Sequence, residues 1–105
     1  MLNKGMWKDK RIVSEEWVSK CAKPYAGNNG IKVPGEDLGN VGYGYTWWTK
    51  QSAKYGEMFF ALGWGGQKIM VIPDLNAVVV FTGANYQTKV KQLKILEKFV
   101  LPAFN

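Results

Sequence analysis

The fold is decided by the stretch KIMVIPDLNAVVVFT, residues 68–82, in which two apolar runs flank the tetrapeptide Pro-Asp-Leu-Asn. Runs of this length that are rich in β-branched residues are typical of strands, and the tetrapeptide has the chemistry of a turn. We therefore predict strands over 68–72 and 77–82 that pair as an antiparallel hairpin. The uninterrupted apolar run 78–81 further predicts a strand that is covered on both faces, at an internal position of a sheet with helices packed on it.

Upstream of the hairpin, two more segments have strand composition. The run 58–62 is short and apolar, and the run 43–49 is rich in Tyr, Trp and Thr. A turn is expected between them at 54–57. Residues 25–44 contain many Gly and Asn residues, and this composition predicts a long loop.

Helices are expected at both ends of the chain. Ser14 can cap a helix that begins with two acidic residues and stops before Pro24. Near the C-terminus, Thr88 can cap a longer helix that Pro102 would end. Apolar residues recur along it at steps of three and four. These residues are Val90, Leu93, Ile95, Leu96, Phe99 and Val100.

Together these elements predict an α+β fold. We expect an antiparallel sheet of three to four strands, an N-terminal helix and loop region, and a C-terminal helix packed on the sheet. With 105 residues, 47% of them apolar and 21% charged, the chain is a single globular domain or part of one.

The residue inventory excludes several kinds of chemistry. The chain has no histidine, which rules out Ser-His-Asp or Cys-His catalysis by its own residues. Its single cysteine, Cys21, cannot form an internal disulfide, and the same shortage of ligands argues against a zinc site. No cofactor is implied. No apolar run has the length of about 20 residues that a membrane-spanning helix needs.

The charge balance is basic, with 14 Lys and Arg residues against 8 Asp and Glu residues, a net charge of +6. Such a balance could suit nucleic acid. The lysines, however, are scattered from Lys4 to Lys98 without a basic tract. This spacing favours a solvated surface over a nucleic-acid footprint.

The run GWGGQ, residues 63–67, is the most distinctive candidate site. Three glycines in four positions indicate a backbone conformation, or a close approach, that a Cβ would forbid. One reading is a bulge or bend between strands. The other is a stretch of exposed N–H groups that could bind an anion or a developing oxyanion.

The pair Trp47-Trp48 is the second candidate. Neighbouring residues on a strand point to opposite faces, so one indole should be in the core. The other would face solvent, a ligand or another segment.

The sequence lacks two common catalytic motifs. No P-loop occurs in the sequence, and none of Ser14, Ser19 and Ser52 has the lysine three residues on that an S-x-x-K nucleophile requires.

The order of these pieces resembles the C-terminal part of the penicillin-recognising serine hydrolases. That family includes class C β-lactamases, carboxylesterases, D-amino-acid peptidases and 6-aminohexanoate-dimer hydrolases. The matching runs span nearly the whole chain. They are KRIVSEEWV at 10–18, GYGYTWW at 42–48, FALGWGGQ at 60–67, VIPD at 71–74 and VVVFT at 78–82.

The resemblance implies a partial β-lactamase-like fold whose nucleophilic S-x-x-K motif and Y-x-N-type tyrosine motif lie upstream, in a missing N-terminal part. The family's third motif, Lys-Thr-Gly or His-Thr-Gly, would fall on 61–63, where only Gly63 matches. The residue after that glycine, Trp64, would donate its backbone N–H to the oxyanion hole. Gly65, Gly66 and Trp47 would contact substrate. Ala61 and Leu62 replace the charged pair, which favours the esterase or amidase branches over recognition of a β-lactam carboxylate.

The expected function is therefore hydrolysis of esters, amides or peptides through an acyl-enzyme, with this chain inactive alone and the missing N-terminal part as its partner. Two other readings stay open. One is a small aromatic-rich module that binds sugar, peptide or nucleic acid through Trp47 or Trp48. The other is a structural segment whose uncovered sheet face drives self-association.

Overall fold

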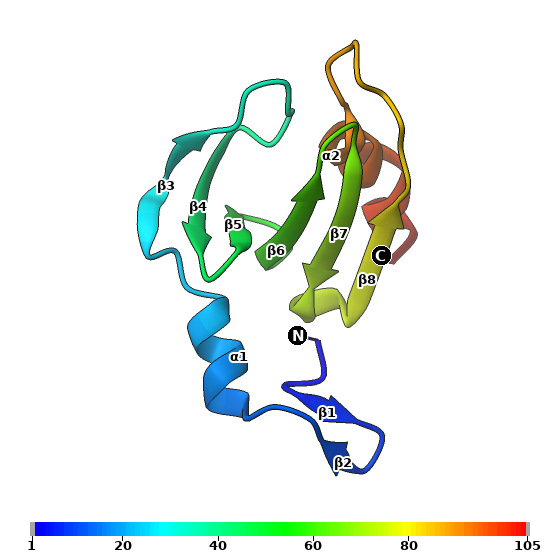
Figure 1. Ribbon diagram of the computed structural model, residues 1–105. Helices are drawn as coiled ribbons and strands as arrows, with labels where there is room; N and C mark the ends of the chain where they lie inside the picture. The colour runs from blue at the N-terminus through cyan, green and yellow to red at the C-terminus, as the bar shows by residue number, and fades with distance from the viewer. Residues whose placement is uncertain (1, 105) are drawn as a thin grey trace.

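The computed structural model describes residues 2–104, apart from the side chains of residues 27–29. Its main feature is a six-stranded antiparallel sheet in which every strand pairs with the next one in sequence (Figure 1). The strands are β3 (Ala26–Lys32), β4 (Asn40–Gly44), β5 (Trp47–Ser52), β6 (Gly56–Gly63), β7 (Gln67–Ile72) and β8 (Ala77–Phe81). A separate two-stranded hairpin, β1 (Met6–Trp7) and β2 (Lys10–Arg11), precedes the helix α1 (Glu15–Cys21).

The predicted α+β class with three to four strands is therefore wrong, because the described residues form a mostly β structure with eight strands. Two of the additional strands, β3 and β4, lie where a loop was expected over 25–44. Ile31 and Val41 pair across them, and the register shifts between Ala26 and Ile31. Residues 27–30 of this stretch occur in an irregular strand rather than in a loop, whereas Gly35 and Gly39 lie in the loop between β3 and β4.

The strand predicted over 43–49 is two strands joined by a tight turn. Tyr45 and Thr46 occupy this turn with φ angles of 43° and 70°, and Gly44 pairs with Trp47 on either side of it. Two consecutive positive φ angles are the mark of a type I′ hairpin turn, which usually contains Asn or Gly. Neither residue is of that kind, so the sequence lacked the usual signal for a hairpin here.

The hairpin predicted from the stretch 68–82 is confirmed. β7 and β8 pair antiparallel, with Ile72 opposite Ala77, and a 3-10 turn Pro73–Leu75 joins them. The prediction that the second strand is internal is wrong. β8 is the last strand of the sheet, and its Val78 and Val80 are exposed.

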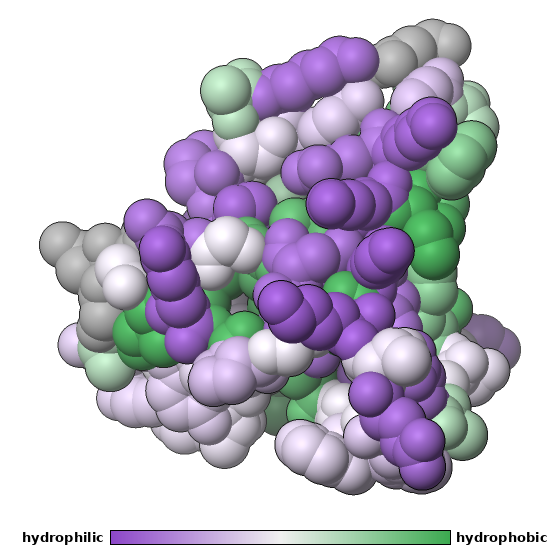
Figure 2. Space-filling view, turned by 90° about the horizontal axis from the view of Figure 1, so that it is seen from above, coloured by the Kyte–Doolittle hydropathy of each residue, from purple (hydrophilic) through white to green (hydrophobic). Residues whose placement is uncertain are grey.

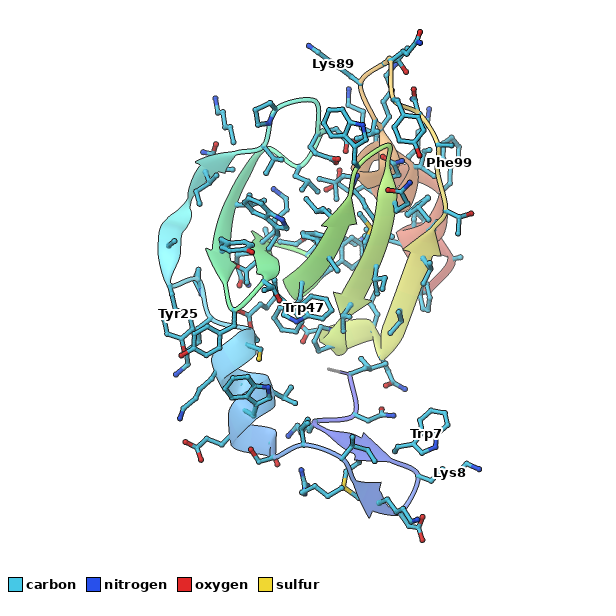
Figure 3. The ribbon with its side chains drawn as sticks, in the orientation of Figure 1. Trp7, Lys8, Tyr25, Trp47, Lys89 and Phe99 are labelled. Atoms are coloured by element: carbon cyan, nitrogen blue, oxygen red, sulfur yellow. The ribbon has the colours of Figure 1, made fainter. Side chains whose placement is uncertain are left out.

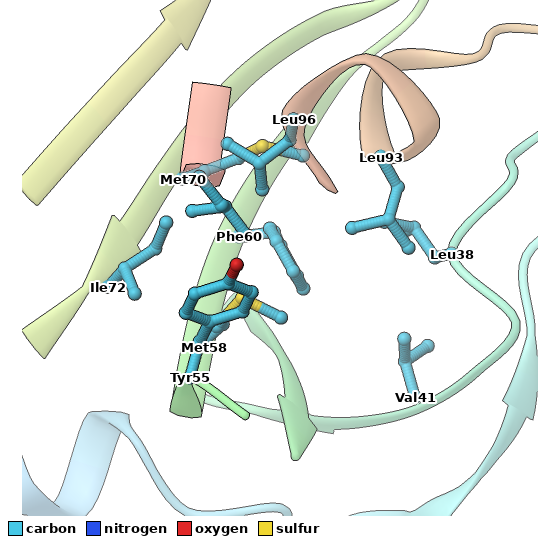
Figure 4. Close-up of a cluster of buried hydrophobic side chains, with 10 residues drawn as sticks. Leu38, Val41, Tyr55, Met58, Phe60, Met70, Ile72, Leu93 and Leu96 are labelled. Carbon is cyan, nitrogen blue, oxygen red and sulfur yellow. The ribbon is translucent and has the colours of Figure 1, made fainter. Parts of the chain in front are cut away.

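The core lies on one face of the sheet, under the C-terminal segment (Figure 4). Phe60 and Met70 point from the central strands toward Leu93 and Leu96, and all four side chains are buried. Their cluster also contains Leu38, Val41, Tyr55, Met58, Ile72 and Leu101. Burial of these apolar side chains is the main term that stabilises the sheet against unfolding.

The C-terminal segment is helical but shorter and less regular than predicted. It consists of α2 (Gln92–Ile95), a π turn (Leu96–Val100) and a 3-10 turn (Leu101–Phe104). Thr88 does not cap it, and Pro102 lies within its last turn. Ile95 and Phe99, expected to widen the buried stripe, are exposed.

The N-terminal helix α1 follows its prediction closely. The Ser14 side chain accepts a hydrogen bond from the Trp17 N–H at 3.1 Å, and Val18 and Cys21 are buried. The Trp17 ring stacks on Tyr45, at the β4–β5 turn, with ring centroids 5.5 Å apart. A second stack joins Tyr45 to Tyr25 at 4.8 Å.

Candidate functional site

The glycine run forms the turn between β6 and β7. Gly63 and Gln67 are the last paired residues, and residues 64–66 lie outside the ladder. Gly65 and Gly66 have φ angles of 88° and 92°, a region that L side chains rarely adopt. A Cβ on Gly65 would lie 2.5 Å from the Tyr86 ring, so glycine is required there for space as well.

Backbone and side-chain donors of the segment 83–92 form hydrogen bonds with the carbonyl groups of this turn. The Asn85 N–H donates to the Gly65 carbonyl at 2.8 Å, and Gln92 Nε2 donates to the Gly66 carbonyl at 3.0 Å. In the other direction, Gln67 Nε2 donates to the carbonyl of Gly83. The turn and the segment 83–92 are therefore bound to each other through Gly65, Gly66 and Gln67.

A buried ion pair lies next to the turn. The Lys68 ammonium group, on β7, pairs with the Glu36 carboxylate from the β3–β4 loop, and the lysine side chain is fully buried. Lys68 Nζ also donates to Gln92 Oε1 at 3.2 Å. Glu36 Oε2 accepts no further hydrogen bond from the described residues, so Lys68 is its partner there. A buried charge needs such a partner because its desolvation is costly.

The β3–β4 loop is also tied to the C-terminal segment. Both carboxylate oxygens of Asp37 accept hydrogen bonds from α2, one from the Leu93 N–H at 3.1 Å and one from the Lys94 N–H at 2.9 Å. These are N–H groups that a helix start otherwise leaves unpaired. Glu36 and Asp37, which lie within the stretch predicted as a long loop, thus fix the loop to β7 and α2.

A pocket of about 610 Å³ opens at this end of the molecule, between the β3–β4 loop, the glycine turn and the loop that follows β8. Figure 2 views this end from above and shows hydrophilic side chains around apolar ones that lie between them. The pocket is lined by Val33, Pro34, Gly35, Glu36, Trp48, Leu62, Gly63, Trp64, Gly65, Gly66, Asn85, Tyr86, Gln87, Thr88, Lys89 and Val90. We call it the Trp64 pocket.

Four of the predicted site residues meet at this pocket. Gly63, Trp64, Gly65 and Gly66 all line it, and the Trp64 side chain is 81% exposed. Among the turns and loops of residues 2–104, no backbone carbonyl accepts a hydrogen bond from the Trp64 N–H. A main-chain donor in this situation can take an acceptor from a ligand.

Trp47, the fifth predicted site residue, lies elsewhere. It lines a separate hollow beside the N-terminal hairpin, together with Trp7, Ile69 and Val78. Figure 3 shows Trp47 at the opposite end of the sheet from Lys89, which stands at the rim of the Trp64 pocket. Its neighbour Trp48 is the tryptophan that lines the Trp64 pocket, and its ring also packs on Tyr43 at 4.6 Å.

Tyr86 and the Lys68–Glu36 pair were missed by the sequence reasoning. Tyr86 follows the last strand in a stretch with no regular structure, so no periodicity marks it. Lys68 looked like one of many surface lysines. Its position directly after the glycine run, on a strand with buried neighbours, was the available signal that its charge would be buried.

The described residues also bear on two expected absences. Within residues 2–104, no group of three or more His, Cys, Asp or Glu side chains is placed to hold a metal ion. No helix in this range is long and apolar enough to span a bilayer.

In comparisons with known proteins, no family model matches the chain, and no curated protein is significantly similar to it.

Proposed function

We propose that this chain is the C-terminal segment of a β-lactamase-related serine hydrolase and donates the Trp64 N–H to the oxyanion hole during hydrolysis of esters, amides or peptides. The observation that carries the proposal is the position of Trp64. It lies outside the β6–β7 ladder, lines a pocket, and has an N–H without a backbone acceptor among the described turns and loops. The order of motifs along the sequence supports the same assignment.

An oxyanion donor acts by stabilising charge that develops on the carbonyl oxygen in the transition state. One such donor contributes about 3 kcal/mol when it is held in place before the reaction begins. The hydrogen bonds from Asn85 and Gln92 to the carbonyls of the turn provide that rigidity here. A backbone donor is also insensitive to the side chain that it carries, so tryptophan is compatible with the role.

The nucleophile must come from a different segment of the hydrolase. The Ser14 hydroxyl caps α1, and the Ser52 hydroxyl accepts hydrogen bonds from the N–H groups of Lys54 and Tyr55. Neither serine, nor Ser19, lines the Trp64 pocket. Without an attacking group and a proton acceptor, an oxyanion donor accelerates nothing by itself.

The uncovered face of the sheet supports a partner segment of this kind. Ile69, Val78 and Val80 point away from the core and are 44%, 48% and 60% exposed. They give β7 and β8 an exposed apolar patch on this outer face, whereas Val71 of the same face is buried. A face like this is normally covered by another layer of structure.

The test is to mix the chain with an N-terminal segment of a hydrolase from the resembling family, one that carries S-x-x-K and Y-x-N motifs but lacks its own C-terminal part. We expect nitrophenyl ester hydrolysis and a fluorophosphonate adduct on the partner's serine, in the mixture only. An adduct on a serine of this chain would contradict the proposal. So would the absence of an adduct in a mixture that gel filtration shows to be associated, or a failure of the two segments to associate.

A second candidate function is a binding module for sugar, peptide or nucleic acid. The exposed stack of Trp17, Tyr45 and Tyr25 favours it, because stacked rings at a surface can extend onto a sugar or a base. Titrations of tryptophan fluorescence with an oligonucleotide at low and high salt distinguish the two functions. Salt-sensitive quenching would favour the binding module.

A further inference from the structure

We propose that the Trp64 pocket binds an uncharged aromatic group, which would be the acyl or leaving group of the ester or amide substrate. That the aromatic group belongs to a substrate rests on the hydrolase function proposed above. The binding preference itself follows from the walls, the size and the charges of the pocket.

The walls of the pocket are largely aromatic and aliphatic. Trp48 and Leu62 come from β5 and β6, Trp64 comes from the glycine turn, and Tyr86 comes from the loop after β8. The Tyr86 ring packs against Gly65, where it leaves no room for a Cβ. Rings in such a setting favour another ring, through offset or edge-to-face packing.

The volume suits a small organic ligand. At about 610 Å³ the pocket lies within the range of about 300–1,000 Å³ that is usual for sites of drug-sized molecules. A phenyl group with a short ester or amide link fits within it. Trp64 in its lining is strongly exposed to solvent, so the rest of a longer substrate can extend outward.

The charges of the pocket disfavour an ionic ligand. Glu36 is the acidic residue of the lining, and its carboxylate is already paired with the buried Lys68. Lys89, the other charged residue of the lining, is exposed to solvent at the rim. A ligand carboxylate would therefore lose its hydration beside another carboxylate and gain no buried cation, while a ligand ammonium would find its counter-ion already neutralised.

The polar side chains of the rim are largely occupied with each other. Asn85 Nδ2 donates to Thr88 Oγ1 at 2.6 Å, and the Thr88 N–H donates to Asn85 Oδ1 at 3.2 Å. These contacts hold the loop after β8 in shape. They leave the aromatic walls as the main contact surface for a ligand.

The test is a titration of the ¹⁵N-labelled full chain with three ligands that share a benzyl group: neutral N-benzylacetamide, anionic phenylacetate and cationic benzylamine. The indole N–H signals of the five tryptophans report where each ligand binds. We expect N-benzylacetamide to shift the signals of Trp64 and Trp48 in a saturable way. The two charged ligands should bind about tenfold more weakly or worse.

Three variants locate the site. Trp64→Ala and Tyr86→Ala change side chains that are 81% and 57% exposed, so both should fold, and both should weaken binding of N-benzylacetamide. Trp7→Phe changes another exposed tryptophan, in the hollow beside the N-terminal hairpin, and should leave binding unchanged.

Several outcomes would overturn the inference. These are phenylacetate or benzylamine binding as tightly as the amide, shifts confined to other tryptophans, or no saturable binding up to the solubility limit. The titration involves no turnover, so it can fail while the fluorophosphonate adduct forms in the mixed segments, and it can succeed while that adduct is absent.

Discussion

The ammonium group of Lys68 on β7 pairs with the carboxylate of Glu36 on the loop between β3 and β4. The pair therefore connects β7 to the β3–β4 loop, and neither β3 nor β4 is a neighbour of β7 in the sheet. Through Gln92, which contacts both Lys68 and the Gly66 carbonyl, it also supports the turn that carries Trp64. The rigidity of the candidate site therefore depends on a charge that is buried beside it.

Removal of one partner should destabilise the fold strongly. Lys68→Met leaves the Glu36 carboxylate buried without its counter-ion, and we expect a loss of about 3–5 kcal/mol in the free energy of unfolding. Urea denaturation followed by circular dichroism measures this loss. The double variant Lys68→Met with Glu36→Leu removes both charges and should recover much of it. A single variant as stable as the original chain would show that the pair contributes nothing.

The cap that Asp37 provides for α2 should be measurable separately. Asp37→Ala removes the acceptor of two N–H groups and should cost about 1 kcal/mol of unfolding free energy. Asp37→Asn keeps one acceptor oxygen and serves as the matched control, with a smaller expected loss. Equal losses in the two variants would mean that the negative charge, rather than the hydrogen bonds, matters at this position.

Glu57 should make stability fall as pH rises. The Glu57 side chain is exposed, but partial desolvation of its carboxyl raises the pKa above the ordinary value, and the nearby Asp74 carboxylate raises it further. The folded chain therefore holds this proton more tightly than the unfolded chain does, so its contribution to stability is present at low pH and is lost as pH rises through the ordinary carboxyl range up to the folded pKa.

Glu57→Gln should consequently raise the melting temperature at pH 7 and leave it nearly unchanged at pH 3. Thermal unfolding at both pH values checks this. Glu97→Gln makes the same change in net charge in the C-terminal segment, and it is the control. A gain from Glu57→Gln at pH 3 that equals the gain at pH 7 would refute the assignment.

The outer face of the sheet should drive self-association when no partner covers it. Val80→Lys places a charge on the edge strand β8 of that face and should lower the apparent mass that light scattering detects. Phe99→Lys is the control, because Phe99 is also exposed and apolar but belongs to the C-terminal segment on the other side of the sheet. If the original chain is a clean monomer, this face does not associate with itself.

Local signals predicted the elements that depend on local chemistry. Ser14 caps α1 as expected, and the Pro-Asp-Leu-Asn turn joins β7 to β8. Both rest on interactions between residues close together in sequence. Strand pairing over 25–44 was not predictable in this way, because it depends on Ile31 meeting Val41 across an irregular register.

The sheet edge was misread for a related reason. A run such as Val78–Phe81 indicates a strand that can be buried on both faces, yet the described chain covers only one face of β8. For the site, composition identified the glycine turn, while the packing of Tyr86 on Gly65 and the pairing of Glu36 with Lys68 depend on tertiary structure. No spacing rule connects residues so far apart.

The backbone N–H of Trp64 is the proposed oxyanion donor, and a pair of substitutions tests this role most directly. Trp64→Pro removes the N–H, while Trp64→Ala keeps it and removes only the indole. The measurement is the rate of acylation of the partner segment's serine by a nitrophenyl ester, in the associated mixture. We predict that Trp64→Pro lowers this rate by about 10²–10³-fold and that Trp64→Ala lowers it far less. Equal rates for the two variants would contradict the account.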